Sequence, residues 1–132
     1  MTILVTDVGE VAALNRFLGR ITPGDMTLAL FKSTNTPSEG DVLGSFTKCD
    51  FTGYSDLTLT KTSWGAPSTT TGTTSSQYAA QNWTCTGTGN TVYGALYIDT
   101  DGTTLIASDL FATPRVIANT DTISFTPRWE AQ

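Results

Sequence analysis

The first apolar pattern in the chain has the period of a helix and ends at Gly19. Its apolar residues fall on one face, with Phe17 at the margin: Val8, Val11, Leu14 and Leu18. Asp7 is expected to be the N-cap, Glu10 completes a capping box, and Gly19 suits the left-handed position that ends many helices. We expect this face to pack on the protein's own sheet. The alternative is that the N-terminal segment docks on a partner subunit.

After a turn at residues 22–24, the pattern changes to the short alternating segments of strands. The expected strands are 26–31, 42–46, 57–61, 78–86, 92–99, 103–107, 115–118 and 122–126. The last two are expected to pair around residues 119–121, and residues 68–76 read as a polar loop. Such spacing predicts an all-β protein, a jelly-roll-like β-sandwich with one short N-terminal helix. We expect one domain, with residues 1–24 as an arm and helix and residues 25–132 as strands.

Composition supports the same fold class. Threonine, a β-branched residue that favours strands, makes up about a fifth of the chain. The charge balance is acidic, with 7 Lys and Arg against 12 Asp and Glu, and the basic residues are scattered. This distribution argues against binding to nucleic acid or to an anionic membrane. With no apparent signal peptide or membrane span, we expect synthesis in a cytoplasm.

Residues that carry chemistry are few. The chain has no histidine, and no nucleophile elbow or phosphate-binding loop is present, so we expect neither catalytic residues nor an enzyme. A pair of carboxylates that cleaves glycans stays an open alternative. Residues 99–102 are interpreted as a hairpin turn, with calcium binding as the alternative. Cys49 and Cys85 are expected to be reduced thiols in or near the core, although a disulfide is conceivable, and we expect no metal or cofactor.

The aromatic residues raise two further questions. Both faces of the segment around Val92 are apolar, so either the domain covers both faces or one face meets another subunit. The candidate interface residues are Tyr93, Ala95 and Tyr97. The three tryptophans suggest either a platform for stacking sugars or burial in the core and at subunit contacts: Trp64, Trp83 and Trp129.

Several segments together resemble one known family. They are Asp7-Val8-Gly9-Glu10, Leu28-Ala29-Leu30-Phe31, Phe51-Thr52-Gly53-Tyr54, Thr91-Val92-Tyr93-Gly94 and the closing stretch from Asn119 to Pro127. Their order resembles small virion structural proteins of tailed bacteriophages, over nearly the whole chain. The resemblance implies a β-sandwich in the phage particle, and it brings no catalytic residues.

Within that class we favour a capsid decoration, or cement, protein on the outer capsid surface. The expected partner is the major capsid protein, and a homotrimer would bridge neighbouring shell subunits. The segment 1–6 is the expected docking arm, with Ile3, Leu4 and Val5 as candidate contact residues. The alternative function is a tail-fibre or receptor-binding module that recognises host-surface glycans.

Overall fold

The computed structural model describes residues 2–131 and consists mainly of antiparallel strands. The strands are β1 (Thr2–Val5), β2 (Met26–Phe31), β3 (Leu57–Leu59), β4 (Ser68–Thr70), β5 (Thr73–Gln77), β6 (Gln81–Thr84), β7 (Asn90–Ile98), β8 (Leu105–Ile117), β9 (Thr122–Phe125) and β10 (Arg128–Ala131). One α-helix, α1 (Asp7–Phe17), and two short 3₁₀ turns, η1 (Leu43–Ser45) and η2 (Lys61–Ser63), complete the fold. The predicted all-β class with a short N-terminal helix is confirmed.

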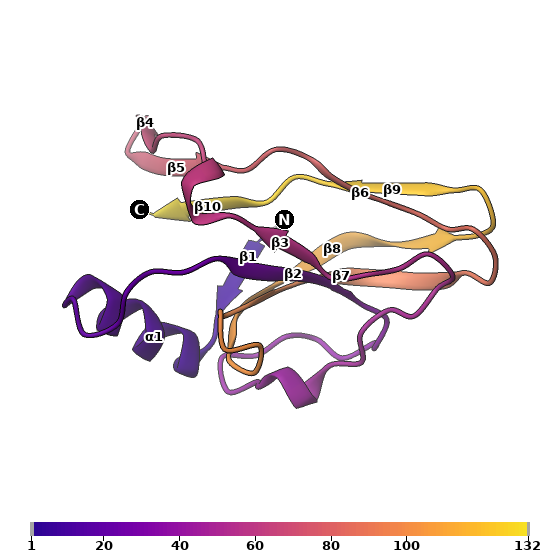
Figure 1. Cartoon of the computed structure of the whole chain (residues 1–132), viewed down its shortest axis with the longest axis horizontal. Helices are drawn as coiled ribbons and strands as arrows, with labels where there is room; N and C mark the ends of the chain where they lie inside the picture. Colours follow the sequence, from indigo (N-terminus) through magenta and orange to yellow (C-terminus); the bar gives the residue numbers. More distant parts are fainter. Residues whose placement is uncertain (1, 132) are drawn as a thin grey trace.

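The strands form two layers. The larger sheet has five strands in the order β1-β8-β7-β2-β3. Above it lie the pair β6-β9 and the three-stranded sheet β10-β5-β4 (Figure 1). Helix α1 lies at one end of this sandwich, and the β4–β5 hairpin projects near the same end (Figure 1).

Strands β2 and β7 occupy the middle of the five-stranded sheet, and both of its faces are covered. Leu28 and Leu30 of β2 enter the main core between the layers, while Ala29 and Phe31 enter a second cluster on the opposite face. The segment between β2 and β3 covers that opposite face and contributes Phe46, whose ring lies edge-on to Phe31 at 4.9 Å. A central strand buried on both sides requires apolar residues at both parities, as the sequence shows.

An irregularity in the pairing of β7 with β8 corrects the predicted subunit interface. The register with β8 shifts between Val92 and Gly94, so Tyr93 does not share a face with Ala95 and Tyr97. Ala95 and Tyr97 are fully buried in the main core, whereas Tyr93 packs against the second cluster. The domain itself therefore covers this strand, and Ala95 and Tyr97 are not accessible to another subunit.

The predicted docking arm is also corrected, because residues 2–5 form an edge strand. β1 pairs with β8 in a register that places Ile3 opposite Asp109 and Val5 opposite Ala107. Ile3 and Val5 pack against the main core, and Leu4 is partly buried. A free arm is therefore wrong for Ile3, Leu4 and Val5, and the boundary at residue 24 does not separate an arm from the strands. Met1 lies outside the described residues.

Three other segments differ from expectation. The predicted strand 42–46 contains the 3₁₀ turn η1 instead. The polar stretch 68–76 lies largely in the β4–β5 hairpin, whose turn places Thr71 and Gly72 at positive φ (51° and 83°). The last predicted pair does not form, because β9 pairs with β6 in the other layer rather than with the end of β8.

Candidate docking surface

Helix α1 is attached to the sandwich at its first turn. The N-cap is Thr6, one residue before the predicted Asp7. The buried Thr6 hydroxyl accepts a hydrogen bond from the Gly9 amide at 3.1 Å and donates one to the Leu105 carbonyl at 2.5 Å. Because one side chain both caps the helix and bonds to β8, the start of α1 is fixed on the five-stranded sheet.

The side of α1 that faces the sheet is made of small residues. Gly9 and Ala12 are its buried residues. A Cβ atom on Gly9 would overlap the Ile106 carbonyl of β8, so only glycine allows this close approach. Farther along, Arg16 forms an ion pair with Asp99, which follows β7. These contacts hold the helix without using its large apolar side chains.

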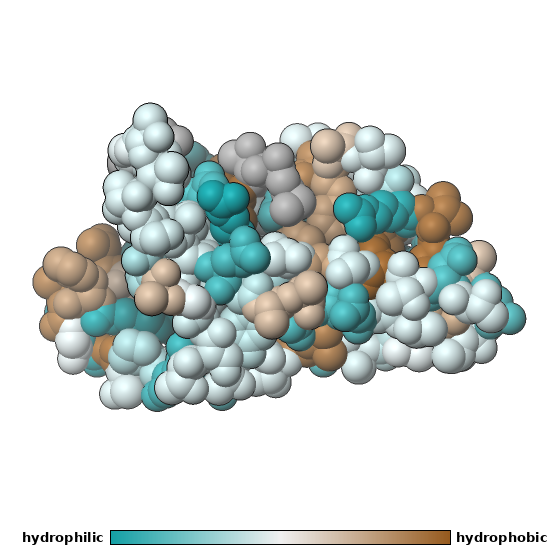
Figure 2. Space-filling model, turned by 90° about the horizontal axis from the view of Figure 1, so that it is seen from above, coloured by the Kyte–Doolittle hydropathy of each residue, from teal (hydrophilic) through white to brown (hydrophobic). Residues whose placement is uncertain are grey.

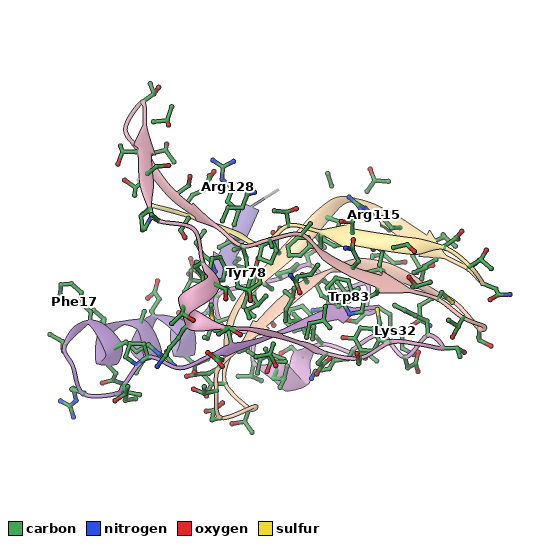
Figure 3. The ribbon with its side chains drawn as sticks, turned by 45° about the horizontal axis from the view of Figure 1, so that its top comes forward. Phe17, Lys32, Tyr78, Trp83, Arg115 and Arg128 are labelled. Atoms are coloured by element: carbon green, nitrogen blue, oxygen red, sulfur yellow. The ribbon has the colours of Figure 1, made fainter. Side chains whose placement is uncertain are left out.

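The large apolar residues of α1 and the turn after it point into solvent. Their exposed fractions are 41% for Val8, 60% for Val11, 61% for Leu14, 86% for Phe17, 66% for Leu18 and 47% for Ile21. Figure 2 shows an apolar patch at the end of the molecule where α1 lies, besides smaller ones elsewhere, and in Figure 3 Phe17 projects away from the body. The prediction that this face packs on the protein's own sheet is therefore wrong. We call these six residues the α1 face.

The size of the α1 face sets it apart from ordinary surface hydrophobics. The six side chains expose on the order of 600 Å² of apolar area, at the upper end of the largest patch on a typical monomer. Contiguous patches of this size mark interaction sites, whereas single exposed apolar residues need no explanation. The structure thus gathers a candidate docking surface on α1, whereas the residues expected to dock were Ile3, Leu4 and Val5, with the helical segment as the alternative.

An apolar cleft lies on the other side of the helix. It has a volume of about 330 Å³, and Gly9 and Ala13 of α1 line it together with Met26, Trp64 and Trp129. Lys61 and Arg16 also border it, but the Lys61 ammonium donates to the Pro23 carbonyl and Arg16 is paired with Asp99.

The three tryptophans do not form one sugar-stacking platform. Trp83 is only 3% exposed, and its indole N–H donates to the Ser55 carbonyl at 2.8 Å. Trp64 and Trp129 are partly buried and pack against the main core while lining the cleft. Burial is therefore the main role of Trp83, and only the other two can meet a ligand.

The segment 99–102 forms part of the connection in the β7–β8 hairpin. The Asp101 carboxylate accepts hydrogen bonds from the Thr103 and Thr104 amides and from the Thr104 hydroxyl. These hydrogen bonds, that of the Thr104 hydroxyl first, lower the pKa of Asp101 to about 2. Between residues 2 and 131, no three His, Cys, Asp or Glu side chains group as ligands for a metal ion. The hairpin interpretation is confirmed.

Both cysteines are free and buried in the main core, as expected. Burial raises the pKa of the Cys49 thiol to about 12, and the Cys85 thiol contacts the Gly87 carbonyl at 3.4 Å. A thiol with so high a pKa is protonated at neutral pH and is a poor nucleophile. Cys49 therefore acts as a small apolar core side chain, and Cys85, which is fully buried, packs in the same core.

Among the described residues, Asp99 and Asp109 are both buried, but only Asp99 has an ion-pair partner, Arg16. Asp109 of β8 is 3% exposed, and its Oδ1 atom has no hydrogen-bond partner among the described residues. Burial raises the pKa of Asp109 to about 6. The register places it between Ile3 of the edge strand β1 and Ala95 of β7, so it lies within the five-stranded sheet rather than in a cleft.

Comparisons with protein-family models, with curated proteins and with solved structures found no match. Among the described residues, no helix has the length and apolar character needed to span a membrane.

Proposed function

We propose that this protein is a structural component of a tailed-phage virion that decorates and stabilises the outside of the capsid. The observation that supports it best is the α1 face, where Leu14, Phe17 and Leu18 are all more than 60% exposed. A protein that works by adhesion needs such a surface on a rigid body. The sequence resemblance suggests the virion, and the α1 face supplies a surface through which copies of this rigid body can associate into the oligomer that decoration needs.

The physical task of decoration suits a rigid sandwich. A capsid repeats the same binding site many times, and an oligomer that holds two or more sites together binds far more tightly than one copy. The expected partner is the major capsid protein, and the resemblance suggests a homotrimer that bridges neighbouring shell subunits. In this proposal the protein is not an enzyme, and its net charge of −5 disfavours nucleic acid and anionic membranes as partners.

Binding to phage heads tests this proposal. Purified protein is mixed with expanded, undecorated heads of a phage that encodes it, and the heads are sedimented. We expect saturable co-sedimentation, and gold-labelled antibody on whole virions should mark the head. Label confined to the tail, or failure to sediment with heads, would overturn the capsid role.

A second candidate function is recognition of host-surface glycans by a tail module. The observation that favours it is the cleft lined by Trp64 and Trp129, since aromatic rings stack on sugars. A glycan array with the Trp64→Ala variant tests it, and Val116→Asp, on an exposed site outside the cleft, serves as control. Glycan binding that is lost in Trp64→Ala and kept in the control supports the tail module, whereas no binding by the native protein contradicts it.

A further inference from the structure

We propose that the α1 face binds the α1 face of a second copy of this chain, with the two helices antiparallel about a two-fold axis. The inference goes beyond the virion role and does not rest on it. The largest exposed apolar surface of the described chain is then covered by a second copy of the same protein.

The area of the α1 face fits such a pair. A stable interface buries roughly 800 Å² on each partner, of which somewhat more than half is apolar. The six residues of the α1 face expose on the order of 600 Å² of apolar area, which is enough to provide the apolar share of one partner. The second copy provides the same apolar area with the same six residues, because a two-fold axis pairs a surface with itself.

The charges at the two ends of α1 favour the antiparallel arrangement. Asp7 and Glu10 lie in the first turn and are exposed, while Arg20 is exposed just after the helix ends. Among the described residues, none of these three side chains forms an ion pair within the chain. An antiparallel pair places the acidic end of each helix beside Arg20 of the other and also opposes the two helix dipoles.

The spacing of the apolar residues agrees with this arrangement. With the axis beside Leu14, an antiparallel helix pair brings Val11 of one copy near Leu18, the C-cap residue, of the other. A parallel bundle around a three-fold axis would instead collect Asp7 and Glu10 from three copies at one end. For a chain with net charge −5, that arrangement adds repulsion, so we infer a dimer in place of the trimer suggested by the resemblance.

The first test measures mass in solution by size exclusion with light scattering across the micromolar range. We expect the native protein to be a dimer and Leu14→Asp to weaken the dimer about 100-fold or more, because each copy would bury an unpaired charge. Val116→Asp, at a residue 77% exposed and far from α1 in sequence, should remain dimeric. Circular dichroism confirms that both variants fold.

The second test fixes the direction of the helices. Glu10→Arg should weaken the dimer about tenfold, because arginines would then face each other at both ends of the pair. Adding Arg20→Glu should restore the native affinity, since each charge pair is reversed. A native protein that stays monomeric, forms a trimer, or shows no rescue in the double variant would overturn the proposal.

Discussion

Strand β7 and helix α1 have similar apolar content, but the large apolar side chains are buried in β7 and exposed in α1. In β7, Val92, Leu96 and Tyr97 are fully buried, because the upper layer covers one face and the segment after β2 covers the other. In α1, Gly9 and Ala12 meet the sheet, whereas Phe17 and Leu18 face solvent. Apolar character therefore maintains the fold in one region and remains available for binding in the other.

The contrast has a simple energetic meaning. Burying a large apolar side chain stabilises a fold by about 1.5 to 3 kcal/mol, and the exposed residues of α1 contribute little of this. A protein that only had to fold would gain by placing such residues inside. Exposed apolar residues that do not stabilise the monomer are those that the proposed dimer would bury.

Two phenylalanines give the largest expected difference between the regions. Phe31 is fully buried beside Phe46, so Phe31→Ala should lower the free energy of unfolding by about 3 to 5 kcal/mol. Phe17 is 86% exposed, so Phe17→Ala should change the unfolding of the dilute monomer by less than about 0.5 kcal/mol. Urea denaturation at low protein concentration measures both. Equal losses would break the comparison, because they would mean that Phe17 packs inside the monomer.

The close approach of α1 to the sheet gives the next effect. Gly9→Ala should destabilise the protein by about 2 kcal/mol, because the added methyl group must push the helix off the Ile106 carbonyl. Gly44→Ala is the matched control, since a Cβ there meets nothing within 4 Å. Thermal melts followed by circular dichroism compare the two. A Gly9→Ala variant as stable as the control would show that the helix does not lie this close to β8.

A smaller effect concerns the buried carboxyl group of Asp109 in β8. Burial raises the pKa of Asp109 to about 6 in the folded state, above the ordinary 3.8, so folding favours the protonated form. The contribution of Asp109 to the free energy of unfolding is therefore fully present below about pH 4, and it is lost as the pH rises through 6. Asp109→Asn should therefore be more stable than the native protein by about 1 to 2 kcal/mol at pH 7, with the difference shrinking towards pH 4.

Asp101→Asn provides a control of opposite sign for that titration. The exposed Asp101 carboxylate has a pKa lowered to about 2 by its hydrogen bonds, so it stabilises the fold above pH 4. Its variant should be the less stable one at pH 7, and the difference should disappear only as the pH falls through 2. Melting temperatures between pH 2 and pH 7.5 separate the two. A pH-independent difference for Asp109→Asn would contradict burial of a titrating carboxyl group.

The sequence predicted the regular elements better than their surroundings. The bounds of β2 followed from its apolar pattern, and Gly19 adopts the expected left-handed conformation with φ of 70°. The face of Tyr93 was assigned wrongly, because strict alternation assumes regular pairing and the register between β7 and β8 shifts at this residue. The two-residue turn at Thr71 and Gly72 was missed because polar threonines around it resembled a loop.

The candidate site was predicted only in part, for a physical reason. Periodicity showed that α1 has an apolar face, but it does not tell what covers that face. The small residues on the other side of the helix could have shown which side packs on the sheet, because Gly9 and Ala12 allow a close approach. The arm 1–6 was misassigned because a short apolar strand at a sheet edge and a free apolar tail look alike in sequence.

Hydroxyl-radical footprinting of Phe17 tests the central claim most directly, since it reports whether the α1 face becomes covered. The rate of oxidation at Phe17 is measured in dilute and in concentrated protein, with the exposed Val116 as an internal reference. If the α1 face is buried in a dimer, oxidation of Phe17 should fall several-fold on concentration while that of Val116 stays constant. Equal oxidation of Phe17 at both concentrations would contradict it.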